Sequence, residues 1–98
     1  MLVHVVLMRS RPGVSSTALD DLARRVSRRT ESVAGQDSCV VGPNLTGEPF
    51  SKQVEFSFVA RFADHAEFDA YHLNPAHKSI SLEIRDALRT AVVSDLGT

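Results

Sequence analysis

The sequence is poor in the residues that stabilise many small proteins or mark common enzyme sites. It contains one cysteine, one tyrosine and no tryptophan among 98 residues. Cys39 has no partner for an intrachain disulfide, and no Cys-x-x-Cys pair is present to hold a structural metal ion. The Gly-x-Ser-x-Gly, P-loop and dinucleotide-binding motifs are also missing. Nothing therefore indicates a serine hydrolase, a nucleotide-binding protein or a nicotinamide enzyme, and we expect no cofactor.

An excess of charge of one sign is absent as well. Eleven lysines and arginines stand against twelve aspartates and glutamates, and the formal net charge is -1 at pH 7. Proteins that bind the nucleic-acid backbone usually carry a strongly basic surface, so we expect no nucleic-acid partner. With 43% hydrophobic and 23% charged residues, the composition is that of a folded globular chain.

The apolar stretch at the start, Leu2 to Met8, is too short to cross a membrane as a helix of about 20 residues. No basic segment or small-residue cleavage site accompanies it, so we expect a strand rather than a targeting signal, and no membrane partner. The unpaired cysteine then favours a cytoplasmic protein. A chain of this length is expected to form one domain over residues 1–98.

Hydrophobic periodicity predicts alternating strands and helices. Apolar residues at helical spacing predict a helix from the caps Ser15 and Ser16 to Gly35. Strands are predicted by β-branched or alternating apolar residues over 2–9, 38–42, 53–62 and 91–96. The loop over 43–51 contains two prolines and a glycine. It is long enough to act as a lid, although a plain connector is the simpler interpretation.

The second helical region is predicted to be broken. Asp64-His65-Ala66-Glu67 fits a capping box, and the helix that follows is interrupted at Asn74-Pro75. Asn74 can cap a new helix whose first residue is Pro75, where a missing N–H costs little. The order of elements is therefore β-α-β-β-α-β.

This order predicts an α+β, ferredoxin-like fold. Two right-handed β-α-β crossovers place both helices on one face of a four-stranded antiparallel sheet. The opposite face would expose Val3, Val5, Leu7 and Val59 on a monomer. We therefore expect a homodimer that packs sheet against sheet.

Several short segments in the same order strengthen this interpretation. They are His4-Val5-Val6-Leu7, Pro12-Gly13-Val14-Ser15, Gly42 with Asn44, the residues Tyr71, Pro75 and His77 in the spacing Tyr-x-x-x-Pro-x-His, and Val93 with Asp95. Together they resemble the stress-responsive dimeric α+β barrel (Dabb) family over nearly the whole chain. The resemblance implies a dimeric α+β barrel. The family includes plant stress proteins that assemble into stable oligomers and a polyketide cyclase, olivetolic acid cyclase, which needs no cofactor.

Resemblance to the cyclase also implies roles for individual residues. It implies a general base at His77, with Tyr71 as its orienting or proton-donating partner and His4 in the same cavity. Phe56 stands where the cyclase has a further cavity histidine, a departure that argues against the same substrate.

The chemistry of the residues is compatible with such a pair. His77 is expected at the third position of a helix, whose positive end lowers the pKa of an imidazole and favours a neutral base. Tyr71 can bond that imidazole or donate to a developing enolate. Equally, the two side chains can form a buried hydrogen bond that only joins the half-helices. The expected apolar wall of the pocket consists of Val6, Phe56, Phe58 and Ile80.

The remaining histidines are less specific. His4 is expected to point between the sheet and the helices, either as a core side chain or as a pocket residue. His65 and His72 are expected on the solvated side of the broken helix. The histidines lack His-x-x-x-His spacing and a matched carboxylate, so we expect no metal site.

Two functions from different classes fit the sequence. One is a cofactor-independent acid–base catalyst, such as an aldol or Claisen-type cyclase or an isomerase, acting on a small apolar or polyketide-like carbonyl compound in a pocket between sheet and helices. The other is a non-catalytic, stress-responsive or ligand-binding assembly module. The sequence leaves both open.

Overall fold

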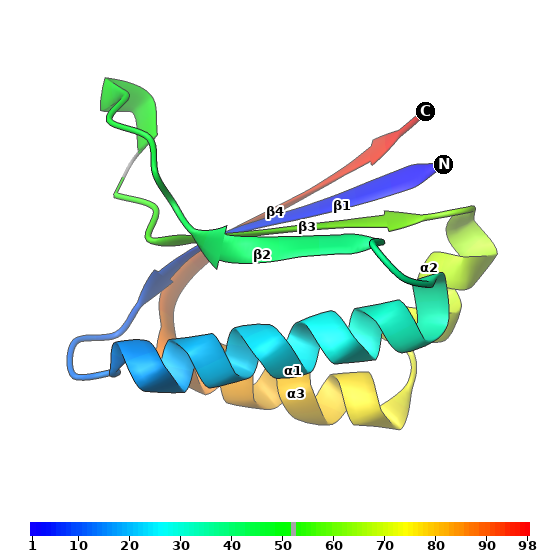
Figure 1. Cartoon of the computed structure of the whole chain (residues 1–98), viewed down its shortest axis with the longest axis horizontal. Coiled ribbons are helices and arrows are strands. Elements are labelled where there is room, and N and C mark those ends of the chain that lie inside the picture. Colours follow the sequence, from blue (N-terminus) through cyan, green and yellow to red (C-terminus); the bar gives the residue numbers. More distant parts are fainter. Residues whose placement is uncertain (52) are drawn as a thin grey trace.

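The computed structural model describes residues 1–51 and 53–98 and has two layers, a sheet and a set of helices on one of its faces (Figure 1). The strands are β1 (Leu2–Ser10), β2 (Cys39–Pro43), β3 (Phe56–Phe62) and β4 (Leu88–Gly97). The helices are α1 (Ser16–Ala34), α2 (His65–His72) and α3 (Pro75–Ala87), with a short 3-10 turn η1 (Pro49–Ser51). The predicted ferredoxin-like α+β fold is confirmed.

The sheet is antiparallel throughout, with the strand order β2-β3-β1-β4. The central strand β1 pairs along its length with β3 on one side and β4 on the other, so that His4 lies opposite Ala60 and Asp95. Successive side chains of a strand point to opposite faces. His4, Val6 and Met8 therefore face the helices.

Helix α1 begins and ends where the sequence predicts. The Ser15 hydroxyl accepts a hydrogen bond from the Ala18 amide at 3.1 Å, and the helix stops at Gly35, whose φ of 95° suits a residue without a side chain. Helix α3 lies beside α1 under the sheet (Figure 1). Arg25 of α1 joins the two helices through a bidentate ion pair with Glu83, with N–O distances of 2.6 and 3.1 Å.

The predicted break of the second helix is also confirmed. The Asp64 carboxylate caps α2 by accepting from the Glu67 amide at 2.8 Å, and the Asn74 side chain caps α3 by accepting from the Ala76 amide at 2.9 Å. Pro75 occupies the first position of α3. The change of direction places the first turn of α3, with His77, against Tyr71 of α2.

The core lies between the sheet and the helices. Its buried apolar side chains are Leu2, Val26, Phe58, Ala60, Phe62 and Tyr71. Helix α1 packs against β2 and β3, and α3 packs mainly against α1. Helix α3 packs against α1 rather than against the sheet. A cavity therefore remains between α3 and strands β1 and β4. Among the described residues, no helix combines the length and apolar composition needed to cross a membrane.

Two strand boundaries differ from the prediction by three residues, and the others agree to within one residue. The third strand begins at Phe56 rather than at residue 53, because Gln53 has a φ of 62° that interrupts an extended backbone. The last strand begins at Leu88 rather than Ala91, because Leu88 is already extended, with φ -100° and ψ 141°, and pairs with Ser10. Strand β4 therefore extends beside β1 over nearly its whole length.

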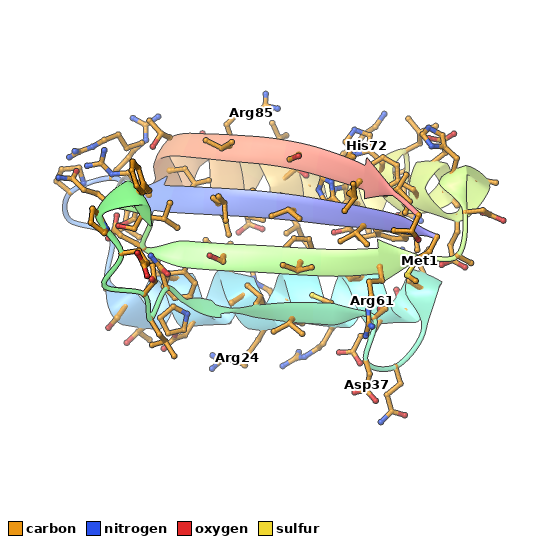
Figure 2. All side chains as sticks on the ribbon, turned by 90° about the horizontal axis from the view of Figure 1, so that it is seen from above. Met1, Arg24, Asp37, Arg61, His72 and Arg85 are labelled. Carbon is orange, nitrogen blue, oxygen red and sulfur yellow. The ribbon has the colours of Figure 1, made fainter. Side chains whose placement is uncertain are left out.

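The face of the sheet away from the helices is apolar and uncovered in the single chain (Figure 2). Val40, Val59, Val92 and Leu96 are exposed there, and Val3, Val5 and Leu7 of β1 are half-buried. The segment that contains η1 rises from the sheet on this same side (Figure 1). It does not cover the helical side, so the loop over 43–51 is not a lid of the cavity described below.

Candidate functional site

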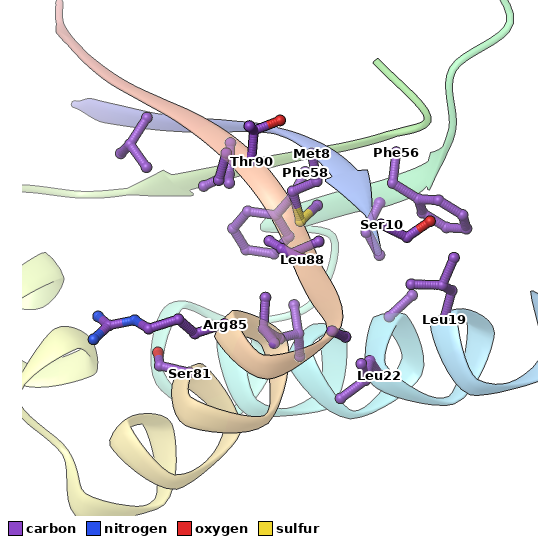
Figure 3. A pocket seen from close by; sticks show the side chains of 18 of the residues that line it. Met8, Ser10, Leu19, Leu22, Phe56, Phe58, Ser81, Arg85, Leu88 and Thr90 are labelled. Carbon is purple, nitrogen blue, oxygen red and sulfur yellow. The ribbon is translucent and has the colours of Figure 1, made fainter. Parts of the chain in front are cut away.

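A cavity of about 470 Å³ lies between the sheet and helices α1 and α3 (Figure 3). In the figure, Met8 and Phe58 point into this space from the sheet, while Leu19 and Leu22 reach it from α1. The cavity is lined by six of the predicted site residues, which are His4, Val6, Phe56, Phe58, Tyr71 and His77. The structure therefore brings together most of the predicted pocket.

Ile80 is the exception. It is half-buried and packs against the core, and it does not line the cavity. The cavity face of α3 instead carries His77, Ser81, Ile84 and Arg85. Ile80 is three residues from His77 and four from Ile84, so it lies at the edge of this same face. Its side chain packs against the core instead of lining the cavity, which corrects its predicted pocket role.

Three histidines from three elements meet at one end of the cavity, namely His4 of β1, His72 of α2 and His77 of α3. The ring centres of His72 and His77 are 5.8 Å apart. His72 is exposed, as predicted, but its ring also lines the cavity, which the sequence did not indicate. Within residues 1–51 and 53–98, no group of three His, Cys, Asp or Glu side chains is arranged to hold a metal ion.

His4 forms a charge-assisted hydrogen bond with Asp95. The distance from its Nδ1 to the Asp95 Oδ1 is 2.5 Å, and the register of β1 against β4 places the two residues opposite each other. An ionised carboxylate can only accept, so Nδ1 carries the proton and donates. The ring is thereby held in one orientation, and no residue in the described part of the chain hydrogen-bonds its Nε2. His4 is largely buried, with 13% of its side chain exposed.

His77 is a neutral imidazole at pH 7. Burial lowers its pKa to about 4, with further lowering by the charges of His72, His4 and Arg29. The predicted direction is correct, but burial rather than the helix end is the main cause. Its Nε2 lies 3.2 Å from the Ser81 hydroxyl, while its Nδ1 is buried without a hydrogen-bond partner among the described residues.

The Tyr71 hydroxyl points to α1 rather than to His77. It lies 3.1 Å from the Thr30 hydroxyl, which in turn donates to the Val26 carbonyl at 2.8 Å. Since Thr30 has one proton, both contacts are satisfied when Tyr71 donates to Thr30. The expected hydrogen bond between Tyr71 and His77 is therefore not formed. Their rings instead pack against each other at a tilt of 43° with centres 4.0 Å apart, and burial raises the pKa of Tyr71.

The buried His77 makes stability depend on pH. The unfolded chain binds a proton at this histidine below pH 6.5, while the folded chain binds it only below about 4, so lowering the pH favours unfolding in this window. A shift of this size corresponds to about 3 kcal/mol, and partial solvent access reduces the expected loss to on the order of 2 kcal/mol. The free energy of unfolding from urea titrations at pH 7 and pH 4.5 measures it.

The control variants separate His77 from the acidic residues that titrate in the same range. His77→Gln should flatten the pH dependence, whereas His65→Gln, which replaces an exposed histidine, should leave it as in the parent protein. An unchanged slope in His77→Gln would show that this imidazole is not held neutral by the fold.

The sequence matches the family model "Stress responsive A/B Barrel Domain" (Dabb) over residues 2–97. The match covers nearly the whole chain, as the resemblance of its short segments implied. Among curated proteins, none matches the sequence.

Solved structures share the fold at low sequence identity. The protein At3g17210 from Arabidopsis thaliana has a TM-score of 0.89 at 18% identity, over 100% of this chain and 95% of that chain. A dimeric ferredoxin-like protein of unknown function from Jannaschia sp. CCS1 has a TM-score of 0.82 at 23% identity, over 99% and 98%. A hydroxynitrile lyase from Passiflora edulis has a TM-score of 0.84 at 17% identity, over 97% and 90%.

Proposed function

The chain belongs to the stress responsive A/B barrel (Dabb) family, and from this premise we propose that it is a cofactor-independent acid–base catalyst acting on a small apolar carbonyl compound. The observation that carries the proposal is the His4–Asp95 pair at the end of a largely apolar cavity. A carboxylate behind an imidazole is a recurring device for proton transfer, because it fixes the tautomer and stabilises the imidazolium that forms.

His4 is the general base in this proposal. Its free Nε2 takes a proton from a carbon beside the substrate carbonyl, or from a substrate hydroxyl, while Asp95 holds Nδ1. The apolar walls exclude water, which strengthens hydrogen bonds to an oxyanion that develops on the substrate. His72 lines the same end of the cavity and is exposed, so it can exchange protons with solvent.

His77 supports the reaction as a neutral group. A base with a pKa of about 4 accepts a proton weakly at pH 7, but a neutral imidazole can donate a hydrogen bond to a carbonyl oxygen. Tyr71 positions His77 by packing against its ring. The resemblance implied the other assignment, with His77 as the base and Tyr71 as its partner, and the variants in the Discussion distinguish the two.

The Passiflora edulis neighbour suggests one reaction class. Cleavage of a hydroxynitrile begins when a base removes the hydroxyl proton; the carbon–carbon bond to the nitrile then breaks, cyanide leaves with the electron pair, and a carbonyl forms. Aldol or Claisen-type cyclisation and isomerisation also begin with proton removal next to a carbonyl. All three need one base and a site for an oxyanion, which is the chemistry proposed for this cavity.

We propose in addition that the chain forms a homodimer through the apolar face of its sheet. The exposed Val59 and Val92 and the half-buried Val5 lie on that face. Some solved structures with this fold, such as that of the Jannaschia protein, are of dimeric proteins. A second copy would cover the apolar face without closing the cavity, which lies on the other side of the sheet.

A screen with purified protein tests the catalytic proposal. We expect turnover, without added metal or nucleotide, in at least one of three reactions: release of an aromatic aldehyde from its hydroxynitrile, cyclisation of a linear polyketone, and isomerisation of an unsaturated ketone. Chromatography of the products measures it, and His4→Ala protein is the matched control. Ligand binding with no turnover in any of the three would favour the non-catalytic ligand-binding or assembly module.

A further inference from the structure

The charged residues of the cavity are distributed unevenly along its length. The histidines lie at one end, near the start of β1. Three arginines, Arg11, Arg85 and Arg89, line the cavity at other positions. Glu55 is the one carboxylate among the lining residues. The net charge of the chain is -1, so this positive lining is a local feature rather than a consequence of an overall basic composition.

The strand register gives the distance between the two ends. His4 pairs with Asp95 near the start of β1, and Ser10 pairs with Leu88 at its other end. Six residues of a strand span about 20 Å. Arg89 follows Leu88 directly, and the Arg11 amide donates to the Ala87 carbonyl at 2.9 Å, so both arginines belong to the end far from His4. Arg85 lies between the two ends, on α3 (Figure 3).

Among the described residues, no carboxylate forms an ion pair with the arginines at the far end. The ion pairs found in the described residues involve His4, Arg24 and Arg25 as the basic partners. None of these pairs includes Arg11, Arg85 or Arg89. Glu55 lies at this same end, where its carboxylate accepts from the Ser10 amide at 2.9 Å and from the Ser10 hydroxyl at 3.1 Å. A second pocket of about 320 Å³ adjoins this end and shares Arg11, Arg89 and Glu55 with the cavity.

We propose that the cavity takes an elongated amphipathic compound whose terminal anionic group, a carboxylate or a phosphate, is bound by Arg11 and Arg89. Guanidinium groups bind both anions through paired hydrogen bonds. Val6, Met8, Leu22 and Phe56 would contact the apolar body of the ligand between the two ends. This inference deepens the proposed function, since it places the reactive carbonyl of the substrate at His4 and its charged end at the arginines.

Binding of simple amphiphiles to the full chain tests the inference without requiring catalysis. Octanoate, octyl phosphate and 1-octanol share one apolar chain and differ in the head group, and NMR titration of ¹⁵N-labelled protein measures their affinities and contact sites. We expect octanoate or octyl phosphate to bind about tenfold more tightly than 1-octanol, with the Nε resonances of Arg11 and Arg89 shifting. The tighter of the two anions identifies the head group.

Variants assign the preference to the arginines. Arg11→Gln/Arg89→Gln should lower the affinity for both anions to that of 1-octanol while leaving 1-octanol unchanged. Arg28→Gln, which removes an exposed arginine that does not line the cavity, should keep the preference. Equal affinities for octanol and the anions in the parent protein, or an anion preference that survives in the double variant, would overturn the inference. Failure of the catalytic screen would not affect these binding results, so the two proposals can fail separately.

Discussion

Replacing His4 with alanine is expected to reduce turnover by about 10²- to 10⁴-fold, the usual loss for a positioned general base. The variant removes the only imidazole of the described cavity that has a carboxylate on its Nδ1. Asp95→Asn should lower kcat as well, because an amide can donate to Nδ1 and favour the wrong tautomer. Steady-state kinetics on the substrate found by the screen, with KM and kcat separated, measures both effects.

The His77 variant decides between the two assignments of the base. If His4 is the base, His77→Ala should reduce kcat less than His4→Ala does, since a neutral hydrogen-bond donor is lost rather than the proton acceptor. A larger loss in His77→Ala would instead identify His77 as the base, as the family resemblance implied. His65→Ala should retain full activity because His65 is exposed and does not line the cavity. Circular dichroism and thermal unfolding confirm that each variant is folded.

The fold was predictable because local signals and global topology agree. The caps at Ser15, Asp64 and Asn74 each accept the hydrogen bond that their position in the sequence predicts. Pro75 fits the start of α3 because its missing N–H has no partner in the first helical turn. The start of β3 was less predictable, since the alternation of apolar residues continues through Gln53 while the backbone there is left-handed.

The candidate site was predictable as a set of residues but not as a set of contacts. Alternation along β1 placed His4 on the helical face, and the helix break placed Tyr71 beside His77. The partners of these groups depend on pairings between distant segments. Asp95 meets His4 only through the register of β4 on β1, and Tyr71 bonds Thr30 only because α1 packs against α2. Neither spacing nor composition specifies those contacts.

Placing a charge at the centre of the open sheet face is expected to separate the proposed dimer. Val5 lies on the central strand opposite Val59 and Ser94, with half-buried neighbours on the same face. Val5→Lys would put two ammonium groups, one from each copy, into the apolar contact. An unpaired charge buried in such a place costs several kcal/mol, so the dissociation constant should rise at least about 100-fold. Sedimentation velocity at micromolar concentration measures the change from dimer to monomer.

The matched control is Leu82→Lys, which places the same charge on an exposed position of α3, on the opposite side of the molecule. This variant should remain dimeric, because the proposed interface is the sheet and not the helical layer. Val5→Lys should also unfold at a lower temperature than the parent protein, since its apolar face loses the cover of the second copy. A Val5→Lys protein that stays dimeric, or a Leu82→Lys protein that dissociates, would assign the pairing to another surface. Because the cavity lies on the helical side of the sheet, monomeric Val5→Lys should still bind octanoate, which would separate assembly from ligand recognition.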